Sequence, residues 1–285
     1  MNKISILQNV KSANIMSEPY PIYLNESCLD QNIFSQLLDE YPDPNLIIKS
    51  NSFREPIIRQ NQRHDMCANQ SLSNNNISEL WLDFVKFHTS NCFYREVISV
   101  FGDDIKKEYP WLEEHFKCKL EDIPTQVRYL DDDDNDQAIS LDCQIGLNTP
   151  VKVPSSVRGP HGDASVELFA FLLYFGGDID NGGDLEIYKW KDVSKIGYMG
   201  EDAPLKNLDL VKTIKSHPNT CAGFINSPKS IHAVTPRGSS ENYRLLVNII
   251  GEVNIKGGLF KKNQTNIIKR YLRSIKRRGL EFIRK

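Results

Sequence analysis

The stretch Arg-Gly-Pro-His-Gly-Asp at positions 158–163 places a histidine and a carboxylate two residues apart. Side chains at positions i and i+2 of an extended backbone leave the same face, so His161 and Asp163 can bind one metal ion together. A dense apolar run follows at 168–175 (LFAFLLYF), and its aromatic content is typical of a buried strand. A pair of candidate metal ligands therefore stands directly before a buried strand.

A second segment, 230–244, supplies a third candidate ligand. His232 follows the apolar pair at 224–225 and precedes a strand-like run at 243–250, and a glycine turn and another strand lie between the two segments. Two imidazoles and one carboxylate on one side of a cation form the facial triad of non-haem Fe(II) oxygenases. An isolated His-x-Asp motif arises easily by chance, so the order of ligand pair, strands, third ligand and basic strand is what favours a metal site.

These segments resemble the 2-oxoglutarate/Fe(II)-dependent dioxygenases of the prolyl-4-hydroxylase-like branch. The resemblance extends over 126–253, and the order of its elements is more specific than any one motif. The matching stretches are His-Gly-Asp at 161–163, Leu-Leu-Tyr-Phe at 172–175, Gly-Gly-Asp-Leu-Glu-Ile-Tyr at 182–188, Asn-Ser-Pro at 226–228 and Ile-His-Ala-Val-Thr-Pro-Arg at 231–237.

The resemblance implies both a fold and a reaction. The fold would be α+β with a mainly β core, a double-stranded β-helix (a cupin-like jelly-roll barrel) with an N-terminal helical layer and a C-terminal helix. The reaction would be hydroxylation of an unactivated C–H bond, with 2-oxoglutarate and O2 as co-substrates and succinate and CO2 as products. His161, Asp163 and His232 would hold Fe(II), and ascorbate is a further cofactor compatible with this chemistry. Asp163 favours hydroxylation over halogenation, because halogenating relatives lack the carboxylate.

The expected anchor for 2-oxoglutarate departs from the family pattern. Members usually carry a Lys or Arg shortly after the distal histidine, and that place here is Asn242. Arg244 lies two residues further on and shares its strand face, so we assign the distal carboxylate of 2-oxoglutarate to Arg244, with Arg237 as the second candidate. Tyr174 either donates a hydrogen bond to the same carboxylate or serves as a core aromatic residue.

The chain divides into three predicted regions: 1–124, a strand and helices packed on the barrel; 125–254, the catalytic core; and 255–285, a basic C-terminal helix. We expect helices at 30–41, 80–89, 92–101 and 105–116, with Asp30 and the asparagines at 74–76 as N-caps. His64 and Asp65 are expected on the surface or on a substrate-side loop.

In the second region, strands are expected at 126–130 and 140–148, joined by an acidic hairpin tip at 131–136. Gln144, Gly146 and Asn148 share one strand face, which would either line a pocket or meet solvent. The polar connection 189–218 is assigned to substrate recognition, because long connections in compact domains often cover or bind ligands.

Composition predicts a soluble cytoplasmic protein. The chain has no apolar stretch of bilayer length, and 1–10 lacks the apolar core of a signal peptide. The six cysteines are scattered without C-x-x-C spacing, which fits reduced thiols. The net charge is −2, but 261–285 carries ten Lys or Arg against one Glu, hence +9, and the remainder carries −11. We favour a docked helix for this tail over contact with an acidic partner, a membrane or nucleic acid.

Three other functions compete with this hypothesis. A non-catalytic barrel should have lost a ligand, and none is missing. A zinc hydrolase could use the same three ligands but would leave the basic strand unexplained. A nucleic-acid demethylating dioxygenase shares the triad, but it needs an aromatic pocket for a flipped base, which the sequence does not indicate. The substrate is expected to be a small molecule or a peptidyl residue, with a peptidyl or free amino acid favoured over nucleic acid, and the oligomeric state stays open.

Overall fold

The computed structural model describes residues 4–50, 58–130, 137–196 and 203–260. Its core consists of two sheets, which are antiparallel except for one short parallel strand. The larger sheet runs in the order β1 (Ile15–Met16), β2 (Ile22–Asn25), β9 (Cys221–Ile225), β6 (Glu167–Gly176), β11 (Arg244–Val253), β5 (Ile139–Asn148) and β3 (Arg63–Met66), with β4 (Thr125–Val127) parallel to β5. The smaller sheet runs β10 (His232–Val234), β7 (Leu185–Trp190) and β8 (Leu208–Ile214).

Apolar and polar residues alternate along the long strand β5, so its two faces differ. On β5 the odd-numbered residues from Ile139 to Leu147 are apolar and belong to the main hydrophobic core. The even-numbered residues from Ser140 to Asn148 point to the opposite face and are polar or glycine. Strand β5 therefore buries one face among apolar side chains and carries polar residues on the other, whereas β2, β6, β9 and β11 contribute apolar side chains on the side of the smaller sheet.

Helices and short 3-10 turns cover the apolar face. They are η1 (Ser12–Asn14), α1 (Gln31–Asp39), α2 (Pro44–Lys49), α3 (Ala68–Leu72), α4 (Glu79–His88), α5 (Asn91–Glu108), α6 (Leu112–Phe116) and η2 (Leu120–Asp122), with η3 (Val193–Lys195) and η4 (Leu205–Asn207) beside the smaller sheet. Asp30 caps α1 as predicted. The predicted cap at 74–76 is wrong, since Ser78 and Ser90 are the side chains that cap α4 and α5.

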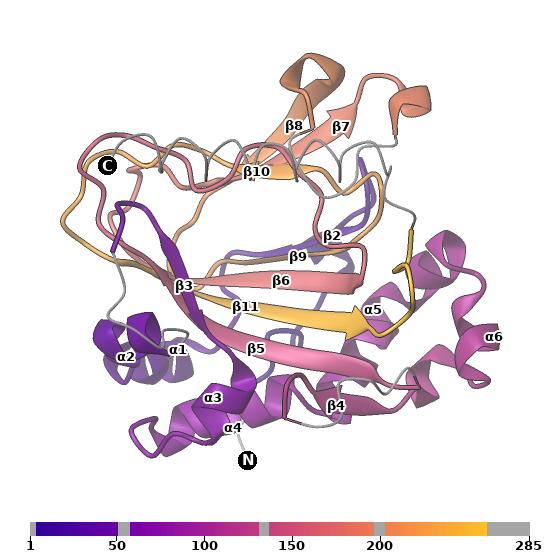
Figure 1. Cartoon of the computed structure of the whole chain (residues 1–285), viewed down its shortest axis with the longest axis horizontal. Coiled ribbons are helices and arrows are strands. Elements are labelled where there is room, and N and C mark those ends of the chain that lie inside the picture. Colours follow the sequence, from indigo (N-terminus) through magenta and orange to yellow (C-terminus); the bar gives the residue numbers. More distant parts are fainter. Residues whose placement is uncertain (1–3, 51–57, 131–136, 197–202, 261–285) are drawn as a thin grey trace, which may run out of the picture.

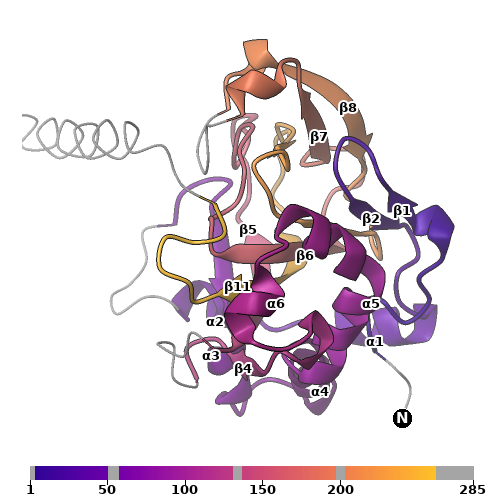
Figure 2. The same ribbon diagram turned by 90° about the vertical axis from the view of Figure 1, so that its right-hand side faces the viewer.

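Aromatic side chains join this helical layer to the sheet. Trp81 of α4 packs against Tyr41 and against Phe175 of β6, with ring centroids 5.1 and 5.2 Å apart. In Figure 1 helices α1 to α4 lie beneath the larger sheet, and Figure 2 shows α4, α5 and α6 grouped on the side away from β7 and β8. The predicted N-terminal helical layer is confirmed, and it shares one core with the sheet.

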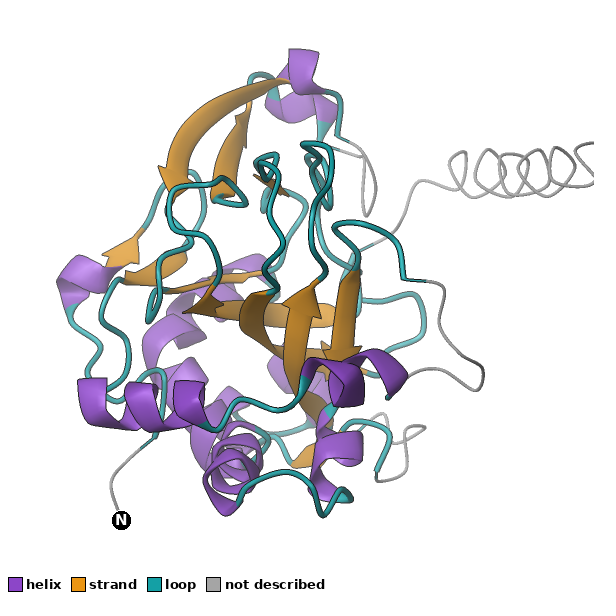
Figure 3. Ribbon diagram, turned by 90° about the vertical axis from the view of Figure 1, so that its left-hand side faces the viewer, coloured by secondary structure: helices purple, strands orange, loops and turns teal. Residues whose placement is uncertain are grey.

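The two sheets pack face to face over a second, smaller core. Leu185 and Ile187 of β7 belong to this cluster together with Phe224 of β9 and Ile250 of β11. Figure 3 shows the strands of the smaller sheet standing apart from the larger sheet, with helices at the opposite end of the molecule. The predicted α+β class with a mainly β core is thus confirmed, but the two sheets do not close into one hydrogen-bonded barrel.

One local expectation is wrong. The connection 189–218 contains strand β8, which pairs with β7 from Trp190 to Leu185, so this segment completes a hairpin instead of forming one long loop. His64 and Asp65, expected on the surface or on a substrate-side loop, are partly exposed on the edge strand β3, which pairs with the end of β5. Both strands are short or polar, which is why hydrophobic patterning did not reveal them.

Some predictions fall outside the described residues, namely the acidic tip at 131–136 and the basic tail at 261–285. The division of the chain at 124 and 254 stays a prediction. Of the helices that the structure describes, none combines the length and the apolar character that crossing a membrane requires.

Candidate metal centre

Sheet register brings the two predicted histidine ligands side by side. The backbone N–H of His161 donates to the carbonyl of His232 at 2.9 Å, and the N–H of His232 donates back at 3.0 Å. His232 begins β10 and pairs on its other side with Ile187 of β7. The segment of His161 therefore extends the smaller sheet by one bridge, and Asp163 follows two residues later.

Three side chains converge at this bridge. Their candidate ligand atoms all lie within 4.8 Å of one another. Oδ1 of Asp163 is 3.6 Å from Nε2 of His161 and 3.6 Å from Nε2 of His232. No other group of His, Cys, Asp or Glu side chains comes together this way in the part of the chain that the structure describes. The structure thus brings together the three residues that the sequence singled out.

Hydrogen bonds aim both imidazoles at the same point. Nδ1 of His161 lies 2.7 Å from the carbonyl of Gly159, and Nδ1 of His232 lies 3.2 Å from the carbonyl of Ser230. A carbonyl only accepts hydrogen bonds, so each Nδ1 carries the proton and each Nε2 keeps its lone pair. Such backbone acceptors commonly fix the tautomer and the ring orientation of metal-binding histidines.

Electrostatics favour the protonation states that a metal ion needs. Burial alone would raise the pKa of Asp163, but His232, His161 and Arg158 outweigh it and lower this pKa to about 2. Burial lowers the pKa of His232 to about 4, against the opposing effect of Asp163. Near neutral pH the centre therefore presents a carboxylate and a neutral imidazole, both of which bind metal without first losing a proton.

Aromatic neighbours hold the His232 segment in place. The hydroxyl of Tyr20 donates to the carbonyl of Ile231 at 2.9 Å, and the ring of Phe224 lies 4.7 Å from the His232 ring. Tyr20 was not among the candidate site residues that the sequence indicated. No local signal could have revealed its role, because it acts on a segment 211 positions away.

A buried arginine lies at the other end of the polar face. Arg244 begins β11 and is 7% exposed, its guanidinium donates to the carbonyl of Gly183, and its charged carbon sits 4.9 Å from the centre of the Tyr174 ring. Burial, and secondarily Arg63, lower the pKa of Arg244. Nε of Arg244 has no hydrogen-bond partner among the described residues. Asn148 pairs with Arg244 in the sheet, and its Nδ2 is likewise buried without a partner there.

Two buried donors without acceptors in the described part of the chain thus lie on adjacent strands, at residues that are register partners. A buried N–H without an acceptor is costly, and such groups are rare in folded proteins unless a ligand or water satisfies them. Tyr174 is fully buried on the neighbouring strand β6, where its ring packs under the guanidinium. Gln144, Gly146 and Asn148 share one strand face, which the sequence assigned either to a pocket or to solvent. This face turns toward the interior, and Gly146 and Asn148 are buried there.

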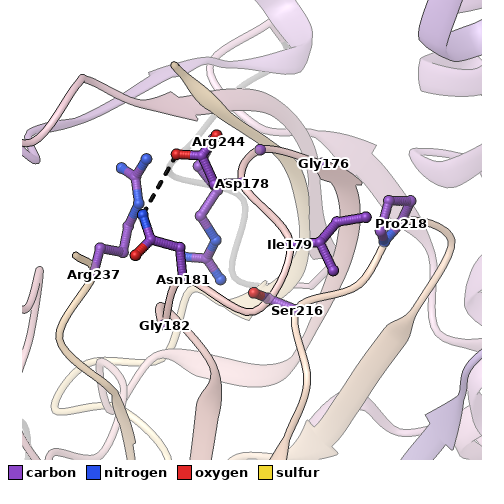
Figure 4. Close-up of a pocket in the computed structure, with 10 residues that line it drawn as sticks. Gly176, Asp178, Ile179, Asn181, Gly182, Ser216, Pro218, Arg237 and Arg244 are labelled. Atoms are coloured by element: carbon purple, nitrogen blue, oxygen red, sulfur yellow. Dashed lines mark hydrogen bonds between the residues drawn. The ribbon is translucent and has the colours of Figure 1, made fainter. Parts of the chain in front are cut away.

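Arg237 serves a different purpose from Arg244. Its guanidinium donates to Oδ1 of Asn61 at 3.2 Å and to the carbonyls of Thr149 and Asn242 at 3.1 and 3.2 Å. Burial, and then the nearby Arg244, lower the pKa of Arg237 to about 10. Both arginines line the wall of the pocket drawn in Figure 4, but the N–H groups of Arg237 donate to neighbouring loops.

Sequence reasoning missed Arg63 on β3. Its Nε lies 2.5 Å from Oδ1 of Asp65. This pair packs against Gly146, because a Cβ added to that glycine would lie 2.3 Å from Oδ1 of Asp65. Arg63 therefore adds a second cation near Arg244. The polar segment around it carried no periodic signal, so only the pairing of β3 with β5 reveals this position.

No protein-family model and no curated protein matches this chain. Solved structures do resemble it. A prolyl 4-hydroxylase from Phytophthora capsici is 13% identical, with a TM-score of 0.45 over 88% of this chain and 66% of that one. A 2OG-Fe(II) oxygenase-family oxidoreductase from Burkholderia pseudomallei is 12% identical, with a TM-score of 0.38 over 85% and 88%. The Arabidopsis thaliana dioxygenase for auxin oxidation 1, solved with 2-oxoglutarate, is 10% identical, with a TM-score of 0.45 over 86% and 87%. These structural neighbours are prolyl 4-hydroxylases and other 2-oxoglutarate/Fe(II) oxygenases.

Proposed function

We propose that this protein is a 2-oxoglutarate- and Fe(II)-dependent dioxygenase that hydroxylates a C–H bond of its substrate. The observation that carries the proposal is the presence of two sites, one on each sheet: a His-Asp-His centre at the edge of the smaller sheet, and, on β11 of the larger sheet, a buried arginine whose Nε lacks a partner among the described residues. The low identities to solved structures add no argument, so the proposal rests on these side chains.

The donor set fits a ferrous ion. His161, Asp163 and His232 would bind it through two Nε2 atoms and one carboxylate oxygen, all of which already converge. Such a set occupies one side of the ion and leaves the opposite positions for co-substrates. Zinc accepts similar ligands, but it would leave the buried donors of Arg244 and Asn148 without a function.

The cradle at the end of β11 fits the distal carboxylate of 2-oxoglutarate. Nε of Arg244 and Nδ2 of Asn148 can donate to its two oxygens, and Tyr174 supports the guanidinium from below. Arg244 contacts Gly183, four residues before Ile187, the sheet partner of His232. Strand β7 thus connects the residue that Arg244 contacts with the sheet partner of His232.

When bound, iron and 2-oxoglutarate supply oxidative decarboxylation, with succinate and CO2 as products, and the oxidising power to hydroxylate an unactivated C–H bond. The residues of the chain bind and orient the iron and its co-substrate and shield them from water. Leu185, Ile187 and Phe224 between the sheets exclude water from this space, which strengthens each charge interaction inside it. Ascorbate is an additional cofactor that this chemistry admits.

We further propose a peptidyl or free amino acid as substrate and a cytoplasmic location. The catalytic core would comprise 125–254, with 1–124 packed upon it and 255–285 appended as a basic helix.

The test is an anaerobic titration with Fe(II) and 2-oxoglutarate. We expect a visible metal-to-ligand charge-transfer absorption in the unaltered protein and its loss in Asp163→Ala, because two imidazoles alone do not complete the facial set. The exposed Asp209→Ala serves as a matched control and should keep the absorption. A protein that binds Fe(II) without this absorption, or an unaffected Asp163→Ala, would contradict the proposal.

A further inference from the structure

The turn between β9 and β10, residues 226–230, is rich in buried polar side chains. Asn226, Ser227 and Ser230 are 0%, 4% and 0% exposed. Oγ of Ser230 donates to the carbonyl of Ile225 at 2.7 Å and lies 3.0 Å from Oγ of Ser227. Burying polar groups costs free energy unless they are matched, so the partners of these side chains indicate what the turn does.

The C-terminal end of this turn orients one candidate ligand. The carbonyl of Ser230 accepts the hydrogen bond from Nδ1 of His232, at 3.2 Å. Because the hydroxyl of Ser230 is bound to the end of strand β9, this residue is held at both its side chain and its carbonyl. The direction of the His232 ring thus depends on the turn.

The N-terminal end of the turn holds the loop after Asp163. Nδ2 of Asn226 donates to the carbonyl of Ala164 at 2.8 Å and to that of Glu167 at 2.9 Å. A carbonyl only accepts hydrogen bonds, so the atom that faces both must be the amide nitrogen. The backbone N–H of Glu167 also donates to the carbonyl of Ala164, at 2.9 Å, which closes a tight turn over 164–167. Ala164 directly follows Asp163, so the side chain of Asn226 fixes the chain next to this ligand.

Side chains from distant elements hold the 226–230 turn itself. The hydroxyl of Tyr109, at the C-terminal end of α5, donates to the backbone carbonyl of Asn226 at 2.7 Å. Nε1 of Trp190, the last residue of β7, donates to the carbonyl of Pro228 at 3.2 Å. The turn is thus joined to the helical layer and to the smaller sheet, which makes it a rigid support for the ligands.

We propose that Asn226 is a positioning residue for the metal centre. Its amide fixes the loop that carries Asp163, and the same turn fixes His232 through the carbonyl of Ser230. One buried turn therefore holds a carboxylate and an imidazole in place for a divalent metal ion, whose affinity increases when its ligands are already arranged. The inference deepens the proposed function and rests on its metal-binding step.

The experiment is an anaerobic calorimetric titration with Fe(II) alone, followed by the charge-transfer absorption after addition of 2-oxoglutarate. Asn226→Leu keeps a side chain of similar size but has no N–H to donate. We expect the Kd of Fe(II) to rise by about tenfold to 100-fold, since groups that orient metal ligands typically contribute this much to metal affinity. The absorption should weaken at the Fe(II) concentration that saturates the unaltered protein.

Asn219→Leu is the matched control for a loss of stability. Asn219 is 5% exposed, and its side chain likewise binds backbone: Nδ2 donates to the carbonyl of Leu29 and Oδ1 accepts from the N–H of the same residue, both at 2.9 Å. These bonds hold the chain just before α1 and not a loop of the metal centre. Both variants should lower the free energy of unfolding, measured by urea denaturation, but only Asn226→Leu should raise the Kd of Fe(II).

A milder pair of variants tests the same turn if Asn226→Leu does not fold. Tyr109→Phe removes the hydroxyl that binds the carbonyl of Asn226, and Tyr23→Phe removes a buried hydroxyl that donates to the carbonyl of Ile6 at 2.8 Å. Tyr109→Phe should raise the Kd of Fe(II) by about threefold or more, within the range that one buried hydrogen bond contributes. Tyr23→Phe should leave this Kd unchanged.

Two results would overturn the assignment: a folded Asn226→Leu whose Kd for Fe(II) stays within about twofold of that of the unaltered protein, or an equal rise of this Kd in Asn219→Leu. Where Asn226→Leu does not fold, an unchanged Kd in Tyr109→Phe overturns it. Fe(II) binding by the unaltered protein without the absorption would refute the proposed function, while the Kd of the variants still decides the role of Asn226. No Fe(II) binding at all would refute both.

Discussion

Arg244 and Arg237 lie close together on one pocket wall, yet their donors meet different partners. Arg237 satisfies side-chain and backbone acceptors of neighbouring loops, whereas Arg244 keeps Nε buried without an acceptor among the described residues. The family resemblance of the sequence made both arginines candidates for the same role. The direction of each guanidinium decides whether the arginine is available to a ligand, as for Arg244, or holds a loop, as for Arg237.

Replacement of Arg244 tests this distinction. Arg244→Ala should raise the Kd of 2-oxoglutarate by about 30-fold or more, equivalent to about 2 kcal/mol, because the distal carboxylate loses its charged partner. Fe(II) affinity should stay unchanged in an anaerobic titration. Arg237→Ala should lower the free energy of unfolding with a smaller effect on 2-oxoglutarate, and the opposite ranking would show that Arg237 is the anchor.

Asn148 offers a second test of the same cradle. Asn148→Ala removes one donor and should raise the Kd of 2-oxoglutarate by about fivefold, equivalent to about 1 kcal/mol. Asn148→Asp should weaken binding further, because its carboxylate would pair with Arg244 and repel the ligand. Isothermal titration calorimetry with the metal-loaded protein measures the Kd of both variants, and a Kd that both share with the unaltered protein would place Asn148 outside the site.

Paired strands let bulky aromatic residues fill the main core. Gly223 of β9 stands opposite Phe171 of β6, whose ring covers the glycine, and an added Cβ would lie 2.0 Å from Cδ1 of that ring. Phe171 also packs against Phe93 and Phe101 of α5. The glycine thus makes room for the ring that attaches the helical layer to the sheet.

A methyl group at this position should therefore disturb the core. Gly223→Ala is expected to lower the free energy of unfolding by about 1–3 kcal/mol, because the ring of Phe171 must shift within a close-packed environment. Urea denaturation followed by tryptophan fluorescence measures the change. Gly159→Ala has no heavy atom within 4 Å of its added Cβ and should stay within about 0.5 kcal/mol of the unaltered protein. Similar losses for both variants would refute the packing argument.

At the scale of the whole molecule, the N-terminal segment is tied to the helices by a buried histidine. Nε2 of His88 accepts a hydrogen bond from the backbone of Ile6 at 3.2 Å, and Nδ1 lies 2.8 Å from the carbonyl of Phe84. Burial lowers the pKa of His88 to about 3 from its ordinary 6.5. The folded protein therefore holds this imidazole neutral near neutral pH.

This histidine should make stability depend on pH. Between about pH 3 and 6.5 the unfolded chain binds the His88 proton and the folded chain does not, so stability falls as the pH drops below 6.5 and is unaffected above it. The share lost at pH 5 is about 2 kcal/mol. His88→Gln should narrow the difference in unfolding free energy between pH 7 and pH 5 by this amount, and an unchanged difference would contradict the assignment.

The sequence by itself determined the fold class, the long strands and the identity of the three candidate ligands. Buried strands such as β5, β6 and β11 carry strong apolar patterning, and His161 and Asp163 share a face through local geometry alone. Capping chemistry likewise placed the start of α1 correctly at Asp30.

Only the tertiary structure decided which distant residues meet. Strands β3 and β8 have weak patterns and form by pairing with neighbouring strands, so the sequence did not predict either strand. The orphaned donor of Asn148 and the support from Tyr20 likewise depend on register and sheet packing. These contacts join residues far apart in the chain, and hydrophobic periodicity carries no information about such pairings.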